Sequence, residues 1–140
     1  MNKIFLPFQI IKYTTEKKNL LEDFILKFYP EEDFYDITNF DSFYENGDFF
    51  VTLNPKNQII ACFSFFYENK DKAVIKRVII SPYWINKGVF EKNIRFMLSS
   101  IIEKGYKEVI LIKNEHTEYL NKFKASGFKD ESDFLFLDWY

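Results

Sequence analysis

The stretch of sequence that decides the fold is residues 78–90, which read VIISPYWINKGVF. The first three residues are apolar and β-branched, which is typical of a buried strand. Pro82 ends that strand, and apolar residues recur at helical spacing from Phe90 onward. The stretch therefore predicts a strand that opens through a tight loop into a helix.

A loop of this kind can bind an anion. Backbone N–H groups at the start of a helix have no partner within the helix, and the helix dipole favours negative charge there. Gly88 would let a phosphate approach the backbone closely, and Lys87 adds a cation. The alternative is an ordinary loop in which Gly88 only relieves backbone strain.

The strands on either side of this stretch predict a mixed sheet. Phe49–Asn54, Gln58–Glu68 and Ala73–Ile80 are apolar runs separated by short turns, which favour an antiparallel meander. The helix that follows is expected to end at Gly105, and Val109–Ile112 forms the next strand. A strand, a helix and a strand in this order imply a right-handed crossover. We therefore expect Ala73–Ile80 and Val109–Ile112 to pair in parallel.

The N-terminal part predicts one more strand and two helices. Phe8–Tyr13 reads as a strand, and Thr14 or Thr15 can cap a helix that Pro30 stops. The acidic and aromatic stretch Asp33–Glu45 predicts a second short helix with loops. Asn46, Gly47 and Asp48 then read as a turn before the meander.

The C-terminal part predicts a last helix and a last strand. Tyr119, Leu120 and Phe123 mark the helix, Gly127 is its C-cap, and Phe134–Trp139 is the final strand. The sequence shows no linker, repeat or low-complexity tract. A single domain over residues 1–140 is expected, which is an ordinary domain size.

Composition excludes several classes of function. The chain has one cysteine, Cys62, and one histidine, His116, so we expect neither a disulfide nor a metal site. Its 19 basic and 21 acidic residues give a net charge of −2, without the basic excess of a nucleic-acid-binding domain. It has no apolar run of about 18 residues, so no membrane span is expected. The apolar stretch at its start is too short for a signal peptide. A cytoplasmic location is the expectation.

Two segments resemble the GNAT family of N-acetyltransferases. Residues 78–90 resemble the family's apolar strand, proline and R/Q-x-x-G-x-G/A segment, and residues 120–128, LNKFKASGF, resemble its helix that ends in Gly-Phe. The resemblance spans most of the chain and is best between residues 58 and 128. It implies a three-layer α+β domain with a mixed, mostly antiparallel central sheet and helices on both faces. It also implies acetyl-CoA as co-substrate.

The resemblance implies where acetyl-CoA would bind. Main-chain groups of the strand would hold the pantetheine arm where the strands splay, and amides of the loop would hold the pyrophosphate. The implied cofactor-binding residues are Val78, Ile80, Asn86, Lys87, Gly88, Val89, Phe90 and Asn114. The segment departs from the family at two positions, because Ile85 replaces Arg or Gln and Phe90 replaces Gly or Ala.

The catalytic residues implied by the resemblance are also altered. The family's usual tyrosine acid, four residues before the glycine of Gly-Phe, is Phe123 here, whereas Tyr119 lies one helical turn earlier and could substitute. His116 near the start of the helix could accept a proton through water. The plainer interpretations are a core aromatic for Tyr119 and a surface residue for His116. The strand before the loop carries Lys76 and Arg77 where the family often has a glutamate base.

The expected activity is transfer of an acetyl group from acetyl-CoA to an amine of a small molecule or peptide, by a monomer or homodimer. The acidic aromatic stretch from residue 29 to residue 36 would lie over the acceptor and attract a cation, unless it is only a solvated loop. Ile85, Phe90 and Phe123 favour the alternative of a catalytically inactive GNAT-like binding or regulatory module. A third alternative is an unrelated α+β protein.

Overall fold

The computed structural model describes residues 8–29, 47–115 and 117–139. Within these residues the strands form one sheet in the order β1-β2-β3-β4-β5-β7-β6. The strands are β1 (Gln9–Lys12), β2 (Gly47–Leu53), β3 (Ile59–Tyr67), β4 (Lys72–Ile80), β5 (Glu108–Ile112), β6 (Lys129–Asp130) and β7 (Phe134–Asp138). Neighbouring strands are antiparallel except for the parallel pair β4 and β5.

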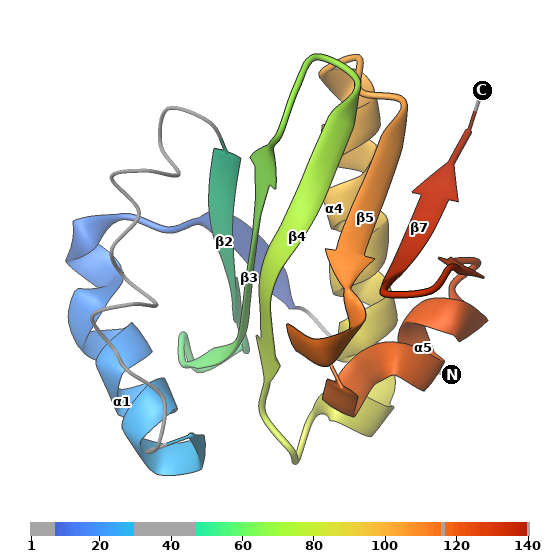
Figure 1. The fold of residues 1–140 in the computed structure, drawn as a ribbon. Helices are drawn as coiled ribbons and strands as arrows, with labels where there is room; N and C mark the ends of the chain where they lie inside the picture. Colours follow the sequence, from blue (N-terminus) through green and yellow to red (C-terminus); the bar gives the residue numbers. More distant parts are fainter. Residues whose placement is uncertain (1–7, 30–46, 116, 140) are drawn as a thin grey trace, which may run out of the picture.

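Helices cover both faces of this sheet, and the expected α+β architecture is confirmed. Helix α1 (Lys18–Phe28) lies on one face, and α4 (Phe90–Glu103) lies behind the other (Figure 1). The short helix α5 (Leu120–Ala125) packs on the same face as α4 through the fully buried Phe123. The expected meander and crossover therefore have the predicted topology.

Three local expectations need correction or fall outside the described residues. The two-residue strand β6 was not predicted, because so short a segment has no periodicity of its own. Thr14 makes no side-chain cap bond, and a 3-10 turn, Thr15–Lys17, separates it from α1. The second helix expected at Asp33–Glu45 lies outside the described residues.

Gly47, expected in a turn, instead begins β2. A Cβ atom at this position would lie 2.2 Å from the carbonyl oxygen of Phe65 in β3. That contact is with backbone, which cannot move aside as a flexible side chain would. Glycine is therefore needed at the start of β2 so that the two strands can approach each other.

Two hydrophobic clusters result from the alternation of side chains along the central strands. On the α1 side, Cys62 of β3 packs with Val51 and Ile79 beneath the helix. On the α4 side, Phe63 packs in the cluster that holds Phe90 and the inner face of α4. Because both faces of the central strands are buried, those strands read as nearly continuous apolar runs.

Asp48 is a buried carboxylate at which β1, β2, β3 and the end of α4 meet, with only 4% of the residue exposed. Its Oδ1 lies 3.1 Å from Lys12 Nζ, and its Oδ2 accepts hydrogen bonds from Lys104 Nζ at 2.5 Å and from the Tyr67 hydroxyl at 2.8 Å. Burial by itself raises the pKa of Asp48, but the bonds from Lys104, Tyr67 and Lys12 together lower it below the usual 3.8. Asp48 is thus held as an anion that links three strands to α4.

Replacing Asp48 with asparagine is expected to lower the free energy of unfolding by about 1–3 kcal/mol near neutral pH, because charge-assisted hydrogen bonds are lost. The folded-state pKa is lowered, so this stabilisation is present above the unfolded-state pKa and is lost as the pH falls through the folded-state pKa. Chemical denaturation of both proteins from neutral pH into acid should therefore show their difference in stability closing below the usual carboxyl pKa.

Asp130 provides the matched control for Asp48. It also pairs with two lysines, Lys113 and Lys124, but its side chain is 47% exposed. Solvent screens such pairs, so Asp130→Asn should cost clearly less than Asp48→Asn. Equal losses, or a difference at Asp48 that persists in acid, would contradict this account.

Candidate functional site

The parallel strands β4 and β5 pair at their beginnings and then separate. Their register runs from Lys72 opposite Glu108 to Val74 opposite Ile110 and goes no further. β4 continues to Ile80, so its second half has an edge that β5 does not cover. Main-chain groups on such an edge can bind a ligand that runs alongside as an added strand.

A β-bulge in β4 accounts for this separation. Arg77 lies opposite Ser64 of β3, and Ile75 lies opposite Phe65, so β4 has one more residue than β3 over this stretch, namely Lys76. A bulge bends its strand and increases the local twist. The second half of β4 consequently diverges from β5 while staying paired with β3.

Two tyrosine hydroxyls meet the last residue of β4. The Ile80 N–H donates to the Tyr119 hydroxyl at 3.3 Å, and the Tyr29 hydroxyl donates to the Ile80 carbonyl oxygen. Tyr119 belongs to the 3-10 turn before α5, and Tyr29 directly follows α1. We call this arrangement of Tyr29, Ile80 and Tyr119 the tyrosine clamp, which joins the two helical layers at one residue of the sheet.

The tyrosine clamp keeps Tyr119 neutral. Burial first, and then the hydrogen bond with the Tyr29 hydroxyl, raises the pKa of Tyr119 well above its ordinary value of 10.0. The structure thus brings this predicted catalytic residue to the uncovered edge of β4, where its hydroxyl accepts from the Ile80 N–H and donates to the Tyr29 hydroxyl, whose own proton goes to the Ile80 carbonyl. Its part in catalysis stays a prediction. No sequence pattern identifies Tyr29 as part of this arrangement, because it lies 51 residues before Ile80 in the chain.

The loop after β4 has the geometry of a small anion-binding concavity. It contains the kinked turn Ile85–Val89, in which Lys87 has φ −112° and Gly88 has φ +85°. A right-handed residue followed by a left-handed one makes successive N–H groups converge. A Cβ atom on Gly88 would meet nothing within 4 Å, so the space above it is open. The Lys87 amide already donates to the Trp84 carbonyl at 3.0 Å, so an anion would depend on the amides that follow.

Phe90, which departs from the family pattern, turns into the core rather than over the loop. It is 1% exposed, and its ring lies 5.9 Å from that of Tyr119 and 5.0 Å from that of Phe123, measured between centroids. Phe123 is fully buried beside it. The ring of Phe90 therefore starts the apolar face of α4 and leaves the loop backbone uncovered.

The structure places the remaining candidate residues as follows. The Val78 side chain is buried, so only its main chain is available to a ligand. Asn86 and Asn114 are both exposed, on the loop and on the turn after β5, respectively. His116 lies outside the described residues. In the described part of the chain, no cluster of His, Cys, Asp and Glu could hold a metal ion. No described helix is long and apolar enough to cross a membrane.

Known structures share this architecture, although sequence comparison alone finds no relative. No protein-family model matches the sequence, and no curated protein matches it. A GNAT-family acetyltransferase from Staphylococcus aureus Mu50 superposes with a TM-score of 0.77 at 17% identity, covering 94% of this chain and 98% of that one. A GNAT-family acetyltransferase from Elizabethkingia anophelis with acetyl-CoA bound gives 0.73 at 15% identity, covering 94% and 98%.

A third similar structure is a spermidine N-acetyltransferase from Vibrio cholerae in complex with CoA and spermine. Its TM-score is 0.70 at 14% identity, and the match covers 94% of this chain and 95% of that one. At such identities the likeness concerns the fold. The chain therefore has the GNAT fold over nearly its whole length.

The tyrosine clamp can be tested by a double-mutant cycle. Tyr119→Phe removes the partner of the buried Ile80 N–H and is expected to cost about 1–3 kcal/mol of unfolding free energy. Tyr29→Phe should also destabilise, and the pair should couple by about 0.5–3 kcal/mol because the hydroxyls interact. Chemical denaturation of the four proteins measures this. Tyr83→Phe, which alters a residue that is 63% exposed, is the control and should change little. Strict additivity of the two losses would argue against the clamp.

Proposed function

We propose that this chain is an acetyl-CoA-dependent N-acetyltransferase that acts on an amine of a small molecule or peptide. The observation that carries the proposal is the uncovered second half of β4, which leads directly into the open loop at Gly88. A strand edge offers main-chain bonds to the pantetheine amides, and the loop offers amides and the Lys87 charge to the pyrophosphate. The GNAT structures with bound CoA or acetyl-CoA support this assignment.

The residues present fit such a co-substrate in part. Gly88 gives the close approach that a phosphate needs, and the inward turn of Phe90 keeps the helix start accessible. Ile85 offers no hydrogen bond to a phosphate, so backbone amides would carry that contact. Val78 and Ile80 would provide the main-chain partners for pantetheine, and Ile80 would have to exchange its bond with the Tyr119 hydroxyl.

Acetyl-CoA would supply a thioester, whose carbonyl carbon accepts the amine nitrogen as the carbon–sulfur bond breaks. The chain's contribution at the departing sulfur is the Tyr119 hydroxyl. Because the pKa of Tyr119 is raised far above that of a thiol, about 8.5, this hydroxyl would keep its proton and stabilise a thiolate by a hydrogen bond. To do so it would have to exchange its bond with the Tyr29 hydroxyl for one with the sulfur. Positioning of the two reactants would supply much of the remaining rate.

The amine would have to lose its proton without a carboxylate on β4. The described part of this strand carries only Lys76 and Arg77 as charged residues beyond Val74. The amine proton would then pass to water, and the role of His116 in accepting it through water stays a prediction. The spermidine enzyme among the similar structures supports an amine as acceptor, with the class of amine left to experiment.

A second candidate function is a catalytically inactive GNAT-like binding module. It is favoured by two observations, namely that Phe123 is buried where the family has its tyrosine and that the Ile80 main chain is already paired with tyrosines. Such a module would keep the fold and bind a partner without turnover.

Binding of CoA separates the two candidates. Calorimetry and thermal unfolding with CoA and acetyl-CoA should show saturable stabilisation, which grows with the logarithm of ligand concentration and reaches about 2.7 kcal/mol at a hundredfold excess over Kd. Gly88→Trp should abolish that shift by filling the open space. The absence of any shift at millimolar CoA would exclude the enzyme and favour the inactive module.

Gly105→Trp is the matched control for Gly88→Trp. Gly105 also has a positive φ, +90°, and also has open space where a Cβ would stand, but it lies at the other end of α4. Both variants carry the same backbone strain and bulk, so only the position differs. Loss of CoA binding in both would mean that the strain, not the loop, is responsible.

The absence of a carboxylate base on β4 predicts the pH dependence of acetyl transfer. Below the pKa of the acceptor, about 10.4 for an alkyl amine, kcat/KM should rise close to tenfold per pH unit as the neutral amine becomes available. Initial rates at subsaturating amine measure this, with stability checked at each pH. A plateau that begins near pH 6 or 7 would instead reveal a protein base.

A further inference from the structure

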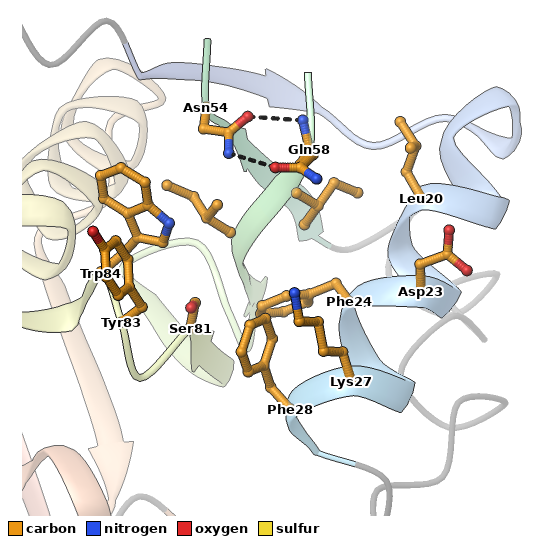
Figure 2. A pocket seen from close by; sticks show the side chains of 12 residues that line it. Leu20, Asp23, Phe24, Lys27, Phe28, Asn54, Gln58, Ser81, Tyr83 and Trp84 are labelled. Carbon is orange, nitrogen blue, oxygen red and sulfur yellow. Dashed lines mark hydrogen bonds between the residues drawn. The ribbon is translucent and has the colours of Figure 1, made fainter. Parts of the chain in front are cut away.

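A cavity of about 400 Å³ lies on the α1 face of the sheet, apart from the uncovered edge of β4. Helix α1 forms one side, the start of β3 and the turn before it form the floor, and residues 81–84 form the other side (Figure 2). We call it the α1 pocket. Its volume is within the range of small-molecule sites, about 300–1,000 Å³.

Ser81 places an unpaired hydroxyl in the α1 pocket. The residue is 1% exposed, and its Oγ has no hydrogen-bond partner within the described chain. Its backbone is held from both sides, because its N–H donates to the Ile60 carbonyl at 2.8 Å and its carbonyl accepts from Trp84 N–H at 3.0 Å. A buried polar group without a partner is unfavourable. A polar atom of a ligand would satisfy it.

Lys27 brings a positive charge to the same space. Figure 2 shows its side chain passing over Phe28 on the cavity side of α1, and its Nζ lies 5.2 Å from the centroid of that ring. Lys27 is exposed and forms no ion pair with any other residue that the structure describes. Asp23, one turn earlier, also lines the cavity and carries the opposite charge.

Aromatic side chains line two opposite sides of the α1 pocket. Phe24 and Phe28 stand on the α1 side, and Tyr83 and Trp84 stand on the loop side. Aromatic walls favour a planar ring, which can stack or meet them edge to face. A single cation and one hydroxyl match the two oxygens of a carboxylate, since each oxygen can take one hydrogen bond.

We propose that the α1 pocket binds a small aromatic carboxylate, with its ring between the two aromatic walls and its carboxylate held by Lys27 and Ser81. This site does not rest on the proposed acetyl transfer, because Lys27 and Ser81 belong neither to the Gly88 loop nor to the tyrosine clamp. Its loop-side wall does adjoin that loop, since Lys87 Nζ lies 4.1 Å from the centroid of the Tyr83 ring.

The test is a calorimetric titration of the full chain with 3-phenylpropanoate. Saturable binding is expected, and the uncharged analogue 3-phenylpropanamide should bind about tenfold more weakly because it loses the ion pair. Lys27→Gln should weaken the acid about tenfold and leave the amide nearly unchanged. Ser81→Ala should weaken the acid severalfold. Lys18→Gln, an exposed lysine at the start of the same helix, is the control and should have no effect.

Each alternative outcome would overturn a stated part of the proposal. The absence of saturable binding, or equal binding of hexanoate, would exclude an aromatic site. Equal affinity for the acid and the amide would exclude the ion pair with Lys27, and an unchanged affinity in Ser81→Ala would exclude the role of Ser81. Lys27 is on the surface, so its variant should fold even if Ser81→Ala does not. The thermal shift with CoA, measured on Lys27→Gln, should persist, so that failure of the α1 pocket and failure of the proposed acetyl transfer can be told apart.

Discussion

Every main-chain polar group of a buried strand needs a partner, and the bulge at Lys76 takes the second half of β4 beyond the reach of β5. Neighbouring parts of the structure supply these partners. Tyrosines from two different layers reach the Ile80 main chain, and the Ser81 backbone is paired with β3 and with the loop that follows. The same divergence that creates the need for partners also creates the edge on which a ligand could pair.

The aromatic core explains how a GNAT fold can lack a tyrosine at the usual position. Phe123 is fully buried, and its ring meets Phe90 edge to face at the start of α4. Tyr119, one turn earlier, stacks on Phe90, and its hydroxyl reaches the Ile80 N–H of β4. Packing and polar chemistry are thus divided between two neighbouring aromatic residues. A tyrosine at position 123 would have to bury its hydroxyl among hydrocarbon.

Much of the fold follows from local patterns in the sequence, whereas much of the site does not. Periodicities of two and of 3.6 residues predict the meander, the crossover and the apolar face that begins at Phe90, because burial acts on each element separately. The hydrogen bonds of Tyr29 and Asp48 join residues far apart in the chain, so no local sequence pattern predicts them. The sequence predicts a turn at Gly47 because glycine is common in turns. The structure instead requires glycine there because β3 approaches the start of β2 closely.

Ile80 and Ser81 are consecutive residues that face different spaces, one at the uncovered edge of β4 and the other at the α1 pocket. A single peptide unit is therefore common to both. If occupancy of one space shifts that unit, the free energy of binding in the other must change as well. Thermodynamic linkage makes such an effect reciprocal, so each ligand would alter the affinity for the other by the same factor.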